Sequence, residues 1–170
     1  MPITVVSWDV DGTLYDMGPM VRHVVWLGLG GLCARPLRTW RELGRLRRFR
    51  RAMNLVRARG GALLPGDVPA DRGELIALEE RWYGRAIARV GLRAGVTDLI
   101  ADLRARGLRQ IVVSDYRAEY KLRLLGLEGA FDRVYAGEDL GFLKPAPQLL
   151  AAVARDLGVA PAHILHLGDR

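Results

Sequence analysis

The sequence has one cysteine, two lysines and three histidines among its 170 residues, and it contains no long apolar run. A single cysteine cannot form an internal disulfide, which fits a protein of a reducing compartment. We expect Cys33 itself to be a buried small apolar residue. The apolar stretch over residues 24–33 is too short to span a bilayer and contains three glycines. Met1 and Pro2 lead directly into an apolar segment without the basic start of a signal peptide. These absences predict a soluble cytoplasmic protein with no membrane span.

Positive charge is concentrated in one part of the chain. Residues 13–93 hold 16 arginines and seven acidic residues, whereas the rest of the chain holds 10 basic and 12 acidic residues. This asymmetry favours anionic ligands or an anionic surface near residues 13–93. The alternative interpretation is a solvated helix face in a chain that uses arginine for 24 of its 26 basic residues.

Hydrophobic patterns predict an α/β fold. The apolar run from Ile3 to Trp8 is typical of a buried strand, and further short strands alternate with helices. These strands are expected at 110–114, 134–136 and 164–167, and the helices at 97–106, 118–125 and 148–157. Such alternation indicates a parallel sheet with helices on both faces.

The segment over residues 16–91 has helical patterns and predicts an α-helical cap inserted after the first strand. Within it, 35–59 is expected to form a basic amphipathic helix. Asp71 is expected to cap the next helix, with Glu74 as its partner in a capping-box arrangement. The predicted organisation is a core made of residues 1–15 and 92–170 with a helical cap over residues 16–91.

Polar residues follow several of the predicted strands. Asp9 and Asp11 come directly after the first strand, and in open α/β sheets ligands bind at this end of the strands. Ser114, Lys144 and Asp169 also lie at a strand end or on a loop that can reach the same edge. Each alone has an ordinary interpretation: a polar turn, a hydroxyl that caps a turn, a surface charge or a terminal acid. Their order and common placement favour a single site.

The segments Asp9-Val-Asp11-Gly-Thr, Val-Ser114-Asp, Leu-Lys144-Pro and Leu-Gly-Asp169 together resemble the haloacid dehalogenase-like hydrolase superfamily. The resemblance implies a Rossmann-like core with a helical cap. It implies that Asp9 is a nucleophile that forms an aspartyl-phosphate, that Asp11 is the general acid and base, and that Ser114 and Lys144 bind phosphate. It also implies Mg²⁺, held by the Asp9 side chain, the Asp11 main-chain carbonyl and the Asp169 carboxylate.

This chemistry suits the residue types. The Asp9 carboxylate is ionised at neutral pH and needs no activating base, but it requires a cation to offset the charge of a phosphate dianion. Lys144 is one of only two lysines, which indicates that a compact ammonium group is needed there. Lys121, by contrast, is predicted to be a solvated helix residue. Asp115 is expected only to shape its loop.

The resemblance implies a magnesium-dependent phosphatase that acts on a small phosphorylated metabolite. Asp11 argues against dehalogenation at carbon, and the absence of lysine from residues 13–93 leaves no candidate for a Schiff base in the cap. A phosphomutase remains an alternative. Members of the superfamily usually continue beyond the fourth motif with a second acid, a helix and a strand, so the C-terminal part of the core is expected to be missing.

An alternative of another class is a catalytically impaired or truncated protein whose Arg-rich cap binds nucleic acid or an anionic surface. The sequence leaves the substrate and the oligomeric state open.

Overall fold

The chain folds around a four-stranded parallel sheet in the computed structural model, which describes residues 2–169 and leaves Met1 and Arg170 outside. The strand order is β3-β2-β1-β4. The strands are β1 (Val5–Trp8), β2 (Arg109–Ser114), β3 (Arg133–Ala136) and β4 (Ile164–Leu167). The predicted α/β class and Rossmann-like parallel sheet are therefore confirmed, and each predicted strand is found within two residues of its expected ends.

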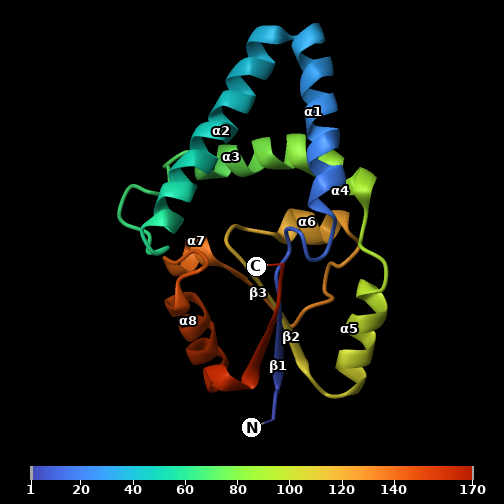
Figure 1. Cartoon of the computed structure of the whole chain (residues 1–170), viewed down its shortest axis with the longest axis vertical. Helices are drawn as coiled ribbons and strands as arrows, with labels where there is room; N and C mark the ends of the chain where they lie inside the picture. The colour runs from blue at the N-terminus through green and yellow to red at the C-terminus, as the bar shows by residue number, and fades with distance from the viewer. Residues whose placement is uncertain (1, 170) are drawn as a thin grey trace.

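Helices cover both faces of the sheet and extend beyond its carboxyl edge. They are α1 (Met17–Ala34), α2 (Pro36–Ala58), α3 (Arg72–Glu79), α4 (Arg85–Val90), α5 (Val96–Ala105), α6 (Glu119–Leu124), α7 (Gly137–Leu140) and α8 (Pro147–Leu157). A π-helical turn (Glu80–Gly84) joins α3 to α4, and a 3-10 turn (Pro161–His163) precedes β4. In Figure 1, α5 and α8 lie on opposite sides of the strands, and α1 to α4 lie beyond the strands' carboxyl ends. None of the helices within residues 2–169 is long and apolar enough to cross a membrane.

The core is divided by the sheet because successive strand residues point to opposite faces. On one face, Val6 and Val112 pack in a buried cluster with Ile100 of α5. On the other, Val5 and Ile111 pack against α8. Both faces are thus covered by apolar side chains, as expected for a parallel sheet, and the carboxyl edge is left for polar residues.

The helices between β1 and β2 pack through the apolar positions that the sequence indicates. The buried residues are Leu46, Phe49, Met53 and Val56 on α2, and Leu75, Leu78, Trp82 and Ala86 from α3 to α4. Asp71 occupies the N-cap position of α3 as predicted, but the predicted capping box is wrong, because the Asp71 side chain makes no capping hydrogen bond. Asp71 and Glu74 instead lie 2.5 Å and 2.9 Å from Arg45 of α2, where a guanidinium group offers the carboxylates a stronger, charged partner than a main-chain amide.

Cys33 is exposed, so the expectation of a buried cysteine is wrong. Helix α1 buries the side that carries Met20 and Gly28, and Gly31 packs close to Thr39 of α2. Two residues beyond Gly31, Cys33 is rotated by roughly 200° around the helix and therefore points away from the packed side.

Among the contacts that join the α1–α4 segment to the rest of the chain, two involve the α2–α3 loop and α3. Ala62 forms an isolated antiparallel bridge with Phe142, flanked by hydrogen bonds from Leu63 N to the Gly141 carbonyl and from Leu143 N to the Gly61 carbonyl. The second contact is a buried ion pair of 2.7 Å between Arg72 of α3 and Glu138 of α7, and Arg72 also lies 3.1 Å from Glu79. These contacts hold the α2–α3 loop and α3 against the rest of the chain.

Candidate active site at the carboxyl edge of the sheet

A cavity of about 670 Å³ lies between the carboxyl edge of the sheet and α2. All five site residues predicted from the sequence line it, and they are Asp9, Asp11, Ser114, Lys144 and Asp169. Helix α2 contributes Arg50, Asn54 and Arg57, which are spaced so that they share one face of the helix. The parallel strands thus bring together residues that are far apart in the sequence.

Asp9 occupies the centre of this arrangement at the end of β1. Its side chain is largely buried, and its Oδ1 atom lies 2.6 Å from Lys144 Nζ. The main-chain amide of Val10 donates a hydrogen bond of 2.8 Å to the same oxygen. Two donors on one oxygen hold the carboxylate in a single orientation beside a positive charge.

Asp115 holds Lys144 in place. One of its oxygens, Oδ1, accepts a hydrogen bond of 2.7 Å from Lys144 N, and the other accepts hydrogen bonds from Arg57 of α2 at 2.8 Å and 3.1 Å. Tyr116 also accepts a hydrogen bond from Arg57. Asp115 therefore shapes its loop as expected, and it additionally ties the Lys144 loop to α2, which the sequence does not indicate.

Asp11 is paired with Lys121, and the prediction that Lys121 is a solvated residue is wrong. Lys121 is only 6% exposed, and its Nζ atom lies 2.6 Å and 2.8 Å from the two carboxylate oxygens of Asp11. Tyr15 donates a further hydrogen bond to Oδ1 of Asp11. The short helix α6 buries Tyr120, Lys121 and Leu122, so its inward side is wider than an amphipathic stripe. The scarcity of lysine that drew attention to Lys144 applied equally to Lys121.

These partners decide the charge of Asp11. Burial raises the pKa of its carboxyl group, but the charge and hydrogen bond of Lys121 and the hydrogen bond of Tyr15 outweigh burial, so the pKa lies below its ordinary value. Asp11 is therefore ionised at neutral pH in this arrangement. An ionised carboxylate can accept a proton from a neighbouring molecule.

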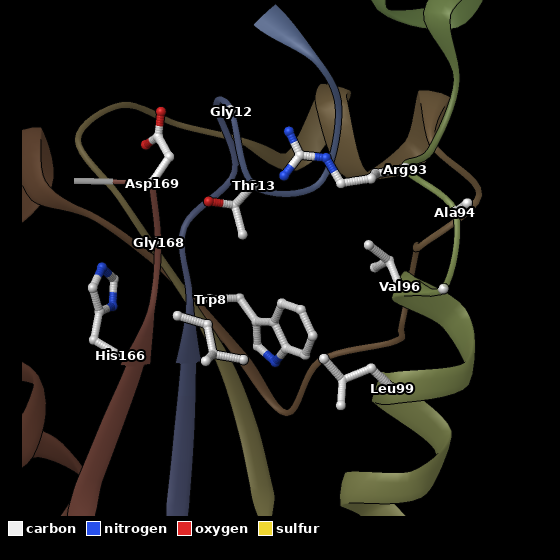
Figure 2. Close-up of a pocket in the computed structure, with 12 residues that line it drawn as sticks. Trp8, Gly12, Thr13, Arg93, Ala94, Val96, Leu99, His166, Gly168 and Asp169 are labelled. Carbon is white, nitrogen blue, oxygen red and sulfur yellow. The ribbon is translucent and has the colours of Figure 1, made fainter.

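Asp169 follows β4 and lies beside the turn after β1 (Figure 2). A Cβ atom added to Gly12 would lie 2.4 Å from Asp169 Oδ2, and Gly12 has a φ of +88°. Only glycine accommodates both the positive φ and the close carboxylate. The turn thus brings the main chain that follows Asp11 against the Asp169 carboxylate. Ser114, which is buried at the end of β2, reaches the same cavity.

The oxygen atoms of this cavity suit a hard divalent cation. No group of three His, Cys, Asp or Glu side chains in residues 2–169 is arranged to hold a metal ion, and the Asp11 side chain is turned to Lys121 and Tyr15. The carboxylates of Asp9 and Asp169 both line the cavity. Mg²⁺ is commonly bound by one or two protein carboxylates, and its remaining coordination positions are filled by oxygens of the main chain, water and substrate.

His166 lies under the site in β4 and also lines a second cavity of about 450 Å³ beside Trp8 and Leu99 (Figure 2). Its Nδ1 atom is 3.0 Å from Ser7 Oγ, and its buried Nε2 atom has no hydrogen-bond partner among the described residues. Burial lowers the pKa of the imidazole, and the positive charge of Lys144 lowers it further. His166 is therefore neutral at neutral pH.

The wall of the main cavity formed by α2 is positively charged. The Arg50 guanidinium lies 4.8 Å from the centre of the Tyr83 ring, and Arg57 pairs with Asp115 at 2.8 Å. Burial lowers the pKa of Arg50, but nearby Tyr83 and the negative charge of Asp11 outweigh burial and raise it. Both guanidinium groups thus stay charged across the cavity from Asp9, where they can receive an anionic group.

Comparison with known proteins shows which proteins this chain is similar to. A family model described as haloacid dehalogenase-like hydrolase matches residues 3–170. The phosphoglycolate phosphatase of Escherichia coli O157:H7 is 30% identical over 192 residues, which cover 96% of this chain and 73% of that protein. The phosphoglycolate phosphatase of Thiobacillus denitrificans is 28% identical over 182 residues, covering 99% and 76%. The solved structure of the HAD-hydrolase YfnB from Bacillus subtilis, bound to magnesium, superposes with a TM-score of 0.67 at 21% identity and covers 100% of this chain and 81% of that chain.

Proposed function

This chain belongs to the haloacid dehalogenase-like hydrolase family, and we propose that it is a phosphatase that cleaves a small phosphorylated acid with Asp9 as its nucleophile. The observation that carries the proposal is the ion pair of 2.6 Å between Lys144 Nζ and Asp9 Oδ1 inside the site cavity. An ammonium group in this position offsets part of the repulsion between the attacking carboxylate and a phosphate dianion.

The reaction proceeds in two steps on the residues of the cavity. Asp11, which is ionised in the free chain, first takes up a proton from solvent as the substrate binds. Asp9 attacks phosphorus, the bond from phosphorus to the ester oxygen breaks, and that oxygen takes this proton from Asp11. A water molecule then gives a proton to Asp11 and attacks the aspartyl-phosphate, which releases inorganic phosphate and restores Asp9. The pair between Asp11 and Lys121 favours the ionised Asp11 that the second step needs. Ser114 and Lys144 bind the phosphoryl oxygens throughout.

Mg²⁺ is the proposed cofactor, held by the carboxylates of Asp9 and Asp169 and the main-chain carbonyl of Asp11. When bound, it supplies positive charge that draws a carboxylate and a phosphate together. The support is the donor set, because both carboxylates line the cavity and Gly12 leaves the space that the Asp169 carboxylate occupies.

The substrate class follows from α2 and from the relatives. Arg50, Asn54 and Arg57 face the cavity from the side opposite the sheet and suit a substrate with a second anionic group. The relatives are named phosphoglycolate phosphatases, and phosphoglycolate carries a carboxylate two atoms from its phosphate ester oxygen. We propose a phosphorylated carboxylic acid of this size, with phosphoglycolate as the first candidate.

The residues proposed to react with phosphate and those proposed to face the rest of the substrate lie in different parts of the chain, which supports two domains. Residues 1–15 and 92–170 form the proposed catalytic core, which carries the residues that react with or bind phosphate. Residues 16–91 form the proposed cap, which carries the residues that face the rest of the substrate. The support is that α1 to α4 lie together beyond the carboxyl ends of the strands (Figure 1).

The test is release of inorganic phosphate by the whole chain, with and without Mg²⁺, from phosphoglycolate and from a phosphate monoester of similar size without the carboxylate. We expect magnesium-dependent release that is faster for phosphoglycolate and that falls by about a thousandfold or more in Asp9→Asn. Asp98→Asn, at an exposed position on α5, is the matched control and should keep the parent rate. A parent chain that releases no phosphate from either ester, or an Asp9→Asn chain with the parent rate, would contradict the proposal.

A further inference from the structure

Helices α1 and α2 form a hairpin that projects away from the sheet and turns at residues 34–36 (Figure 1). Large apolar side chains are exposed along α1 and the first half of α2: Val21, Val25, Trp26, Leu29, Leu32, Leu37 and Trp40. We refer to these seven residues as the hairpin apolar set. Trp26 is 74% exposed and Trp40 is 73% exposed, so two of the four tryptophans of the chain present most of their surface to water.

The hairpin apolar set follows helical spacing. Val21, Val25, Leu29 and Leu32 lie four, four and three residues apart and therefore form one stripe along α1. Met20 and Gly28 face the packed side of the same helix. Helix α1 is thus apolar on both sides, and Arg22 is its only charged residue. A helix that is apolar all round normally buries both sides, so the exposed stripe is suited to contact with a further apolar phase.

Positive charge surrounds this apolar surface. Residues 17–58 contain ten arginines and one acidic residue, Glu42. Arg22, Arg35, Arg41, Arg47, Arg48 and Arg51 are exposed, and none of these six forms an ion pair with another residue in the range 2–169. The surface that carries the hairpin apolar set therefore attracts an anionic partner.

We propose that the α1–α2 hairpin docks on the surface of an anionic lipid membrane, with the hairpin apolar set inserted among the acyl chains and the exposed arginines at the headgroups. Tryptophan and leucine beside arginine is the composition of helices that lie in a membrane interface. No described helix can cross a bilayer, so the hairpin lies on the membrane rather than through it. The attraction between basic residues and anionic headgroups adds to the gain from burying the apolar side chains.

Charge argues against the other occupants. A second copy would bring two strongly basic hairpins together, and like charges across an interface oppose association. Nucleic acid would pair with the arginines and could stack on the tryptophans, but it offers nothing to the aliphatic stripe of Val21, Val25, Leu29 and Leu32. A lipid surface satisfies the aliphatic, aromatic and basic residues together.

The experiment measures co-sedimentation of the whole chain with vesicles of phosphatidylcholine alone and of phosphatidylcholine mixed with phosphatidylglycerol. We expect binding to the mixed vesicles only, weakened by added salt. Binding should also shift tryptophan emission to shorter wavelength and reduce acrylamide quenching. That signal reports on Trp26 and Trp40, because Trp8 and Trp82 are already buried.

Variants at matched positions distinguish docking through the hairpin from nonspecific binding of the chain to vesicles. Trp26→Ser combined with Leu29→Ser should weaken vesicle binding about a hundredfold or more, since burial of each side chain is worth roughly a tenfold gain in binding. Leu64→Ser and Leu99→Ser, which change residues that are 57% and 42% exposed outside the hairpin, should bind as the parent does. Arg41→Glu with Arg48→Glu should weaken binding, whereas Arg106→Glu on the core should not.

Three results would overturn the proposal: no binding to the mixed vesicles, equal loss of binding in the Leu64→Ser control, or a concentration-dependent dimer or a nucleic-acid complex in a chain that does not bind vesicles. Because the assay needs no turnover, a negative result leaves the proposed phosphatase standing. Conversely, an inactive chain that still binds anionic vesicles would contradict only the proposed function.

Discussion

At the scale of single residues, the two lysines of the chain have parallel positions, each beside one of the paired carboxylates. Lys144 meets Asp9 from a loop, and Lys121 meets Asp11 from α6. The two aspartates are two residues apart and point to different partners, so neither carboxylate shares its cation with the other. This separation gives the two acids different surroundings, which is the condition for different chemical roles.

The pair of Lys121 and Asp11 should contribute to stability. Lys121→Met removes the charge from a side chain that is 7% exposed and leaves Asp11, 31% exposed, with Tyr15 as its remaining partner. We expect the free energy of unfolding, measured with urea, to fall by about 2 kcal/mol, less than for a fully buried pair because water reaches Asp11. Arg123→Met is the control, since Arg123 lies on the same helix in an exposed pair with Glu80 and should cost less than about 1 kcal/mol. Equal losses in the two variants would show that the Lys121 pair is not specifically stabilising.

His166 should make stability depend on pH. Its pKa in the folded chain lies below the ordinary value of 6.5, so the unfolded chain takes up a proton at higher pH than the folded chain does. The contribution of neutral His166 is therefore complete above pH 6.5 and is lost as the pH falls toward the folded pKa. The difference in free energy of unfolding between the parent and His166→Gln should shrink as the pH falls from neutral to acidic, in denaturant titrations of both chains. A difference that stays constant or grows would contradict this account.

At the scale of elements, strand ends were the most predictable feature. Apolar runs bounded by polar residues gave β1 to β4 within two residues of their ends, and the parallel arrangement then placed Asp9, Ser114 and Asp169 at one edge. Predictions from the local sequence pattern were wrong for side chains whose interaction partners are distant in the sequence. The side chain of Asp71 pairs with Arg45 instead of making a capping hydrogen bond to α3, and Lys121 is buried beside Asp11, more than a hundred residues away in the sequence. Neither partner is visible in a window of neighbouring residues.

The loop between α2 and α3 should control the position of Lys144. In Gly61→Ala the new Cβ would lie 2.3 Å from the Leu143 carbonyl oxygen at a φ of +83°, whereas at Gly60, with a φ of +98°, nothing lies within 4 Å. Gly60→Ala should therefore cost only the strain of its positive φ, about 1 kcal/mol, and Gly61→Ala about 3 kcal/mol in unfolding titrations. Phosphate release should fall only in Gly61→Ala, because the displaced Leu143 carries Lys144 with it. If the two variants have similar stability and similar rates of phosphate release, then the loop between α2 and α3 does not control the position of Lys144.

At the scale of the whole molecule, the cavity exists because two parts of the chain are held at a fixed separation. Its floor comes from the sheet edge and its opposite wall from α2. The sequence predicts that both parts exist and that they meet at the sheet edge, but it does not predict the contacts that hold them. Those contacts depend on Arg72, Glu138 and Gly61, which belong to no recognisable motif and acquire their roles only when the parts are packed together.

The ion pair between Arg72 and Glu138 should be the strongest of these contacts. Arg72 is buried between Glu138 and Glu79, so Arg72→Met leaves two buried carboxylates without their guanidinium partner. We expect a loss of about 3 kcal/mol in free energy of unfolding and a rise in KM for the phosphorylated substrate, because α3 and the attached α2 can move away from the sheet edge. Arg106→Met, which breaks an exposed pair with Asp102, provides the matched control and should cost less than about 1 kcal/mol with KM unchanged. If the two variants lose equal stability, or if KM is unchanged in Arg72→Met, then the pair does not set the width of the cavity, and α2 is held by the loop contact at Gly61 and the ion pair between Arg57 and Asp115.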